Sequence, residues 1–280
     1  MFHYRPRRVS FGGQFRPSGV IKLKFGLLLC LGGVLAAPAQ AAQCSAQSGA
    51  QTTALVELYT SEGCDSCPPA DRWLSSLATR GYDTARVVPI ALHVDYWDYI
   101  GWKDPYAKAA FSARQRKLAQ VQRARIVYTP QVMLQGEDFR AWHGAEFDRA
   151  VDRINARPAS ARIALRLDAD AKDAFRVEVE AVLAADSATP DAQLYLASYE
   201  NKLASEVSAG ENRGHTLRHD FVVFEWIGPL AFERDGRLAE RRVLPLLPRA
   251  VARNSGVVAF VQSRSTAKVL QAVMLPACPR

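Results

Sequence analysis

The chain has 280 residues, of which 49% are hydrophobic and 23% are charged. This composition excludes a disordered chain, a collagen and a membrane protein with many spans. The net charge of +8 is concentrated at the N-terminus, because residues 1–42 contain six of the 36 basic residues and none of the 28 acidic residues. The rest of the chain therefore has 30 basic and 28 acidic residues. Because a nearly neutral body lacks a cationic surface for phosphates, we expect no nucleic-acid partner.

Residues 1–42 have the layout of a secretory signal peptide. Lys22 and Lys24 precede a 13-residue apolar run at 25–37, and alanine-rich sequence follows it. The run is shorter than the about 20 apolar residues of a transmembrane helix. We therefore expect an exported protein, periplasmic or extracellular, that touches the membrane only transiently through its signal peptide. The mature chain should begin near Ala42 or Gln43.

Four cysteines remain after removal of the signal peptide, which carries Cys30. An even number suits an exported protein, where disulfides persist, and four cysteines allow three pairings. Cys64 and Cys67 are separated by two residues, whereas Cys44 and Cys278 bracket the mature chain. The economical pairing is Cys64–Cys67 together with a structural disulfide between Cys44 and Cys278.

The first half of the mature chain predicts alternating strands and helices. Residues 54–60 read as a buried strand, the CxxC motif leads into a helix that ends near residue 79, and residues 86–94 form a second strand. Asp104 before Pro105 predicts a capped helix start, and this helix runs to about residue 123. After Thr129-Pro130 we expect strands at 131–135 and 138–142 and a helix at 145–156.

The pattern changes near residue 158. Seven strand-like segments follow without long helical patterns, at 162–168, 175–183, 192–199, 216–226, 241–247, 256–263 and 268–274. Short polar connections between alternating segments favour an antiparallel sandwich. The expected organisation is a signal peptide at 1–42, an α/β domain at 43–158 and an all-β, sandwich-like domain at 159–280.

Two resemblances refine this expectation. The order strand, CxxC, helix, strand, helix, Thr-Pro, strand, strand, helix resembles the thioredoxin fold. Four stretches also resemble the DUF1223 family of exported bacterial proteins: VELYTSEGCDSCPPAD (56–71), HVDYWDYIGWKDPY (93–106), YTPQVMLQG (128–136) and GENRGHTLRHDFVV (210–223). The resemblance implies a thioredoxin-like domain at 43–158 and export, and it implies no particular substrate.

The thioredoxin resemblance assigns roles to three more residues. It implies a cis bond before Pro130, with Thr129 and Pro130 facing the CxxC and offering backbone to a bound peptide. It also implies a buried acid, here Glu57, as proton acceptor for the second cysteine. The loop between Glu57 and Cys64 is one residue longer here, so an exposed glutamate on the strand face is the alternative.

The leading functional prediction is an exported thiol–disulfide oxidoreductase that acts on protein thiols and disulfides. A thiolate attacks in such reactions, and unpaired N–H groups at a helix start favour it. Cys64 would be the exposed nucleophile and Cys67 the resolving thiol, and no cofactor is needed beyond their disulfide. The alternatives are a non-catalytic binding or scaffold protein, and a copper-handling protein that uses Cys64, Cys67 and His93.

Neighbouring residues could line this site. Asp65 disfavours the Cys64 thiolate and predicts a more reducing couple. His93 and Asp95 share a strand face that could lie beside the dithiol, and Trp97 belongs to an aromatic cluster that either lines the site or packs in the core.

A histidine pair further along the chain has zinc-like spacing. His215 and His219 lie four apart in strand-like sequence, so roughly 13 Å would separate them. That distance is too long for both to bind one ion, and we predict no metal site.

Overall fold

The computed structural model describes residues 43–278 apart from 172–173, 186–188 and 249. The predicted signal peptide at 1–42 lies outside the described residues. The described residues belong to one compact unit, Gln40–Arg280. Within them, no helix combines the length and the apolar character needed to cross a membrane.

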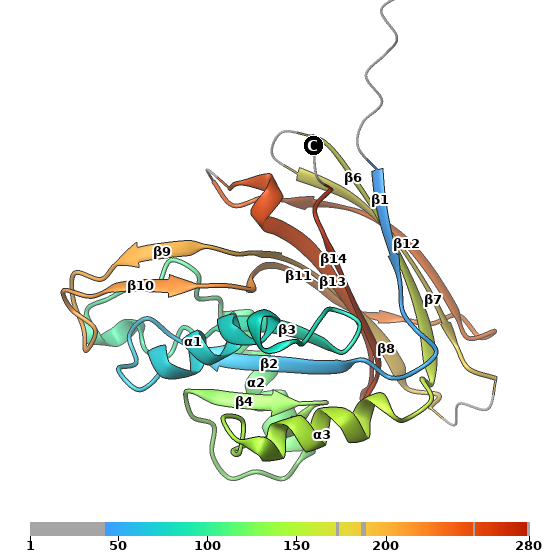
Figure 1. Cartoon of the computed structure of the whole chain (residues 1–280), viewed down its shortest axis with the longest axis horizontal. Helices are drawn as coiled ribbons and strands as arrows, with labels where there is room; N and C mark the ends of the chain where they lie inside the picture. The colour runs from blue at the N-terminus through green and yellow to red at the C-terminus, as the bar shows by residue number, and fades with distance from the viewer. Residues whose placement is uncertain (1–42, 172–173, 186–188, 249, 279–280) are drawn as a thin grey trace, which may run out of the picture. The chain divides into compact units, whose positions relative to one another are not determined.

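The protein is a mixed α/β structure that consists mostly of sheet (Figure 1). Its helices are α1 (Pro68–Ser76), α2 (Ala109–Val121) and α3 (Ala145–Asn155), with short 3-10 turns at Ala78–Arg80, Asp98–Ile100 and Ala252–Asn254. Its strands are β1 (Gln43–Gln47), β2 (Ala54–Thr60), β3 (Val87–His93), β4 (Gln131–Leu134), β5 (Glu137–Asp138), β6 (Ala161–Ala171), β7 (Ala174–Leu183), β8 (Ala192–Glu200), β9 (Leu203–Glu206), β10 (Thr216–His219), β11 (Val222–Ala231), β12 (Arg237–Pro245), β13 (Ser255–Ser263) and β14 (Val269–Pro276).

One eight-stranded sheet contains strands from both halves of the chain, in the order β14-β13-β8-β11-β3-β2-β4-β5. β2 and β3 are parallel and are connected through α1, while β4 pairs antiparallel to β2. β11 joins the other edge of β3: Val222 pairs with Ala91, and Ala91 donates a backbone hydrogen bond to Phe221 (2.8 Å). The predicted division at residue 158 therefore marks a change from helix-containing to all-strand sequence, while the sheet itself continues across it.

A second sheet, in the order β1-β6-β7-β12, packs on the β8, β13 and β14 part of the large sheet. Their shared core is formed by alternating apolar residues such as Leu165, Val179, Leu196 and Val261. Two packed sheets are therefore present in the second half, as predicted. One of them, the eight-stranded sheet, also contains the strands of the α/β half.

The helices cover both faces of the β3-β2-β4 region. Side chains of α1 and α3, such as Leu74 and Phe147, share a core with Val56 and Leu58 of β2. Phe111 and Leu118 of α2 belong to a different core, on the side of Leu55 and Tyr59. Because successive residues of a strand point to opposite faces, β2 contacts α1 and α2 with alternate residues.

Two local predictions differ from the structure. Helix α2 begins at Ala109 with Lys108 as its N-cap, so Asp104 does not cap it. The predicted strand at 216–226 is split into β10 and β11, because Phe221 adopts a positive φ of 59° and its N–H binds the side chain of Asn201 (2.8 Å).

Candidate functional site

The CxxC motif lies between the end of β2 and the start of α1. Cys64 and Cys67 form a disulfide with a Cα–Cα distance of 5.4 Å, as the pairing argument predicts. Cys67 is the N-cap of α1, and Pro68 and Pro69 occupy the first helical positions. Proline suits these positions because the N–H groups there have no partner within the helix.

The disulfide is covered by protein. Cys64 and Cys67 are both 0% exposed, so the expectation of an exposed Cys64 was wrong. The loop between β9 and β10 provides one part of the cover: Nδ2 of Asn212 donates to the carbonyl oxygens of Glu62 and Cys64 (2.9 Å each), and Glu211 accepts from the Asp65 amide (3.1 Å).

Residues after β3 form the other part of the cover. A Cβ atom placed on Gly63 would lie 3.0 Å from Cβ of Trp97 and 3.3 Å from Cδ1 of Ile100, so this position favours glycine. Nε1 of Trp97 donates to Oγ1 of Thr129 (2.7 Å), and the Thr129–Pro130 bond is cis. Since Tyr59 pairs with Gln131, Thr129 and Pro130 lie beside the segment that leads into the CxxC.

Five buried polar residues, called here the polar cluster, lie between the CxxC loop, α1 and β10. They come from the CxxC loop, α1, the end of β3, the loop before α2, and β10: Glu62, Asp71, His93, Asp104 and His219. None of them is more than 6% exposed. Buried charges require partners, so their arrangement is informative.

Each histidine of the polar cluster has one nitrogen bound to a carboxylate. Nδ1 of His93 contacts Oδ2 of Asp104 (2.7 Å), which also accepts from the Glu62 amide (2.9 Å). Nε2 of His219 contacts Oε1 of Glu62 (3.0 Å). The two rings meet edge to face, with centroids 4.9 Å apart. The second nitrogens, Nε2 of His93 and Nδ1 of His219, have no hydrogen-bond partner among the described residues.

The carboxylates control the charge of the polar cluster. Burial alone would raise the pKa of Asp104, but His93 and hydrogen bonds from the Glu62 and Tyr106 amides lower that pKa below its usual value. Burial opposes a charge on His219, yet the carboxylates of Asp71 and Glu62 outweigh it and raise the pKa of His219 to about 10. Without a bound metal ion, His219 therefore carries a positive charge at neutral pH.

Glu57 does not belong to this site. It is fully buried, which excludes the exposed alternative, but it lies on the α2 face of β2, opposite α1. Nε and Nη2 of Arg114 bind its carboxylate at 2.7 and 2.8 Å, and the Tyr59 hydroxyl donates to it (2.9 Å). The Glu57 carboxylate therefore neutralises Arg114, which contradicts its expected role as proton acceptor for Cys67.

Other predicted residues are distributed around the site. His93 points into the polar cluster, whereas Asp95 turns toward α2 and binds the Ser112 hydroxyl. Asp65 is exposed at the rim and Trp97 is half-buried. His215 is exposed and outside the polar cluster, so the two histidines of that motif do not act together.

Sequence reasoning missed Glu62, Asp71, Asp104, His219 and Asn212 as site residues. A signal for His219 existed, because it lies two positions after the apolar Leu217 in a strand and so shares its buried face. No comparable local signal identifies Glu62, Asp71, Asp104 or Asn212, because only contacts formed in the folded chain place them at the site.

The second disulfide joins Cys44 of β1 to Cys278, just after β14, with a Cα–Cα distance of 5.5 Å. This pairing was also predicted. It connects β1, an edge strand of the four-stranded sheet, to the residues that follow β14, an edge strand of the eight-stranded sheet.

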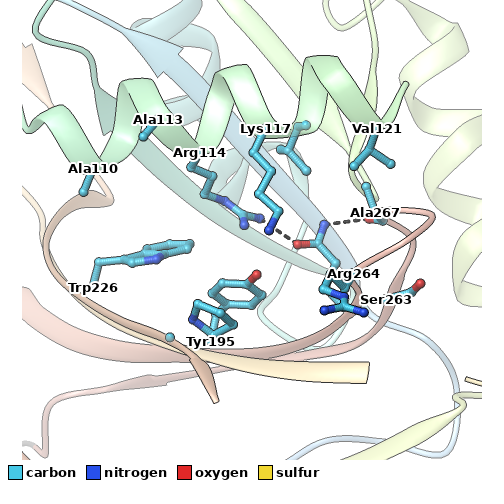
Figure 2. Close-up of a pocket in the computed structure, with 14 residues that line it drawn as sticks. Ala110, Ala113, Arg114, Lys117, Val121, Tyr195, Trp226, Ser263, Arg264 and Ala267 are labelled. Atoms are coloured by element: carbon cyan, nitrogen blue, oxygen red, sulfur yellow. Dashed lines mark hydrogen bonds between the residues drawn. The ribbon is translucent and has the colours of Figure 1, made fainter. Parts of the chain in front are cut away.

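A separate cavity of about 290 Å³ lies between α2 and the strands that carry Tyr195 and Trp226 (Figure 2). The guanidinium of Arg114 lies over both rings, 4.9 and 4.8 Å from their centroids. Lys117 and Arg264 are exposed at its rim, so the cavity combines an aromatic floor with positive charge.

Comparison with known proteins shows similarity in fold to two solved structures. A crystal structure of an Agrobacterium tumefaciens protein is 23% identical, covers 82% of this chain and 96% of its own, and has a TM-score of 0.53. HBP35 of Porphyromonas gingivalis is 17% identical, covers 82% of this chain and 76% of its own, and has a TM-score of 0.63. No curated protein matches the sequence.

A family match covers most of the described chain. The family DUF1223, described as a protein of unknown function, matches residues 55–262, which include the CxxC and every residue of the polar cluster. The chain belongs to the DUF1223 family.

Proposed function

We propose that the protein is an exported thiol–disulfide oxidoreductase whose Cys64–Cys67 pair cycles between disulfide and dithiol. The observation that carries this proposal is the position of the disulfide between the end of β2 and the first turn of α1. The positive end of the α1 dipole favours a thiolate there, which makes such a pair easier to reduce.

The fold around the disulfide supports the proposal. From Ala54 to Asn155 the elements follow as β2, α1, β3, α2, β4, β5 and α3, with the strand order β3-β2-β4-β5. This order resembles that of thioredoxin-like proteins, and we propose that the expected domain at 43–158 is thioredoxin-like from residue 54 onward, since β1 belongs to the second sheet. In that arrangement, the backbone at Thr129 and Pro130 would bind an extended client segment.

The proposed reaction exchanges two electrons. A client thiolate attacks Sγ of Cys64, the Cys64–Cys67 bond breaks, and Cys67 leaves as a thiolate that takes up a proton. A second client thiolate then attacks the client sulfur, which forms the client disulfide and releases Cys64. The Ser66 hydroxyl, 3.4 Å from Sγ of Cys64, is positioned to stabilise a thiolate there. The reverse sequence reduces a client disulfide.

Export is part of the same proposal. Two disulfides among the described residues suit an oxidising compartment, the periplasm or the cell exterior. N-terminal sequencing of the exported protein should find Ala42 or Gln43 first. A product that retains Phe25 to Ala37 would contradict a cleaved signal peptide.

The decisive experiment is equilibration in glutathione redox buffers, followed by alkylation and mass spectrometry. Cys64–Cys67 should open reversibly while Cys44–Cys278 remains closed. A potential of about −120 mV would indicate an oxidase and about −270 mV a reductase. Insulin reduction and refolding of reduced RNase then test turnover, with Cys44→Ser/Cys278→Ser as the variant that keeps the CxxC.

One observation favours a second candidate, a binding or scaffold protein with an inert CxxC bridge: both sulfurs are fully buried. In that case the pair would resist reductant until the protein unfolds, and neither turnover assay would respond. The copper-handling alternative requires both thiolates and His93, so Cu(I) titration of the reduced protein and of its His93→Ala variant tests it.

A further inference from the structure

We propose that Asp71, His93 and His219 bind a divalent transition-metal ion of the Zn²⁺ class. Each residue offers one ligand atom, and these atoms all lie within 4.8 Å of one another. They come from α1, the end of β3 and β10, so the tertiary fold brings them together. Two imidazoles and one carboxylate are a ligand set that zinc accepts, usually with a fourth position left for water.

The two free histidine nitrogens carry this inference. His93 and His219 are 0% and 2% exposed, yet Nε2 of His93 and Nδ1 of His219 have no hydrogen-bond partner among the described residues. Leaving such a buried polar atom unpaired destabilises the folded protein. Nδ1 of His219 lies 3.8 Å from Oδ1 of Asp71, which is too long for a hydrogen bond but leaves room for an ion between them.

The outer contacts already orient the three ligands. Asp104 binds Nδ1 of His93 and Glu62 binds Nε2 of His219, which leaves a lone pair on the other nitrogen of each neutral ring. Thr60 donates to Oδ2 of Asp71 (3.0 Å) and leaves Oδ1 toward the histidines. In protein metal sites, the residues that bind the metal are usually oriented by hydrogen bonds to a neighbouring carboxylate or hydroxyl group.

The dimensions and charge are suitable. Tetrahedral ligands at about 2.0–2.2 Å from zinc lie roughly 3.3–3.6 Å apart, so the side chains must move closer by about 1 Å. Three carboxylates lie in the polar cluster, and a divalent cation would offset their negative charge in this buried position. A cavity of about 160 Å³ lined by Pro68, Asp71, Arg218 and His219 provides a path for an ion to enter.

The proposed site does not need the cysteines as thiolates. Cys67 lies one helical turn before Asp71, whose N–H donates to the Cys67 carbonyl oxygen (3.2 Å), but in the disulfide its sulfur is not a thiolate ligand. Binding by the oxidised protein therefore separates this site from a copper site made of thiols. It also makes the test independent of whether the disulfide is redox-active.

The test uses the oxidised mature protein after removal of metal with a chelator. Zn²⁺ competition against a chromophoric chelator should show one site per chain, and Co²⁺ should give the visible absorption of a tetrahedral complex. Asp71→Asn, His93→Gln and His219→Gln should each weaken Zn²⁺ binding by roughly 100-fold or more, beyond the 10- to 100-fold effect expected for the outer-contact variant Asp104→Asn. His215→Ala, an exposed histidine four positions from His219, is the matched control and should bind like the wild type.

Folding is checked separately, because saturating Zn²⁺ should raise the melting temperature of the wild type and of His215→Ala but not of His219→Gln. Absence of one-site binding in the wild type would overturn the proposal. Binding that survives in both His93→Gln and His219→Gln, or that occurs only after reduction of Cys64–Cys67, would overturn it as well.

Discussion

Asn212 donates a hydrogen bond from Nδ2 to the carbonyl oxygen of Cys64 at 2.9 Å, although 148 positions separate the two residues. The same nitrogen binds the carbonyl oxygen of Glu62, also at 2.9 Å. The loop between β9 and β10 is thereby attached to the CxxC loop, and it contributes to the complete burial of the disulfide. In the proposed reaction, access of a client thiol depends on release of this loop.

The first prediction concerns that attachment. Asn212→Ala removes both hydrogen bonds. The Cys64 carbonyl oxygen keeps the Cys67 amide as a donor (3.2 Å), whereas the buried Glu62 carbonyl oxygen loses its donor, at a cost of about 1–3 kcal/mol. The rate of Cys64–Cys67 reduction by dithiothreitol, followed by alkylation and mass spectrometry, should increase severalfold. Arg213→Ala, an exposed neighbour, is the control and should leave the rate unchanged. Equal rates in the wild type and Asn212→Ala would show that the loop does not limit access.

The second prediction assigns the two cysteines. Cys67→Ser should trap mixed disulfides between Cys64 and client proteins, whereas Cys64→Ser should trap few and abolish turnover, because only Cys64 is attacked by the client. Limiting iodoacetamide between pH 5 and 9, added to the reduced wild type, should label Cys64 first. Preferential labelling of Cys67 would reverse the assignment, and no labelling after full reduction would favour the inert bridge.

The third prediction concerns Cys44–Cys278, which are 234 positions apart. In the chain-entropy description a bridge over so long a loop stabilises the fold by about 5 kcal/mol, against about 2 kcal/mol for the short CxxC loop. Urea unfolding of Cys44→Ser/Cys278→Ser should therefore show a larger loss than Cys64→Ser/Cys67→Ser. The opposite ranking would mean that the CxxC bridge is the main structural one.

The fourth prediction tests the buried ion pair between Glu57 and Arg114. Arg114→Met leaves a buried carboxylate without its cation and should cost about 3–5 kcal/mol in urea unfolding. Adding Glu57→Gln should recover part of that loss, because the uncompensated charge is removed. The redox potential of Cys64–Cys67 should stay the same in the Glu57→Gln variant, since Glu57 lies on the opposite face of β2. A shifted potential would restore a role for Glu57 in proton transfer.

Local features of the fold were predictable because they depend on neighbours within a few residues. Phe147, Ala150, Val151 and Ile154 recur at helical spacing, and they form the buried face of α3. Alternation in β7 placed Phe175, Val177, Val179 and Ala181 on one buried face. Both disulfide pairings followed from spacing and position in the chain, and both are present in the structure.

Only the tertiary structure decided which polar residues meet. Glu57 and Thr60 belong to the same strand, yet one faces Arg114 and the other faces Asp71, and the packing of α1 and α2 determines which face is which. Glu62 and His219 are 157 positions apart and come together through the hairpin of β9 and β10. The periodicity of the sequence indicates which face of each segment is buried. The polar cluster instead results from how a helix, two loops and strands of two different sheets pack against each other, and no single segment determines that packing.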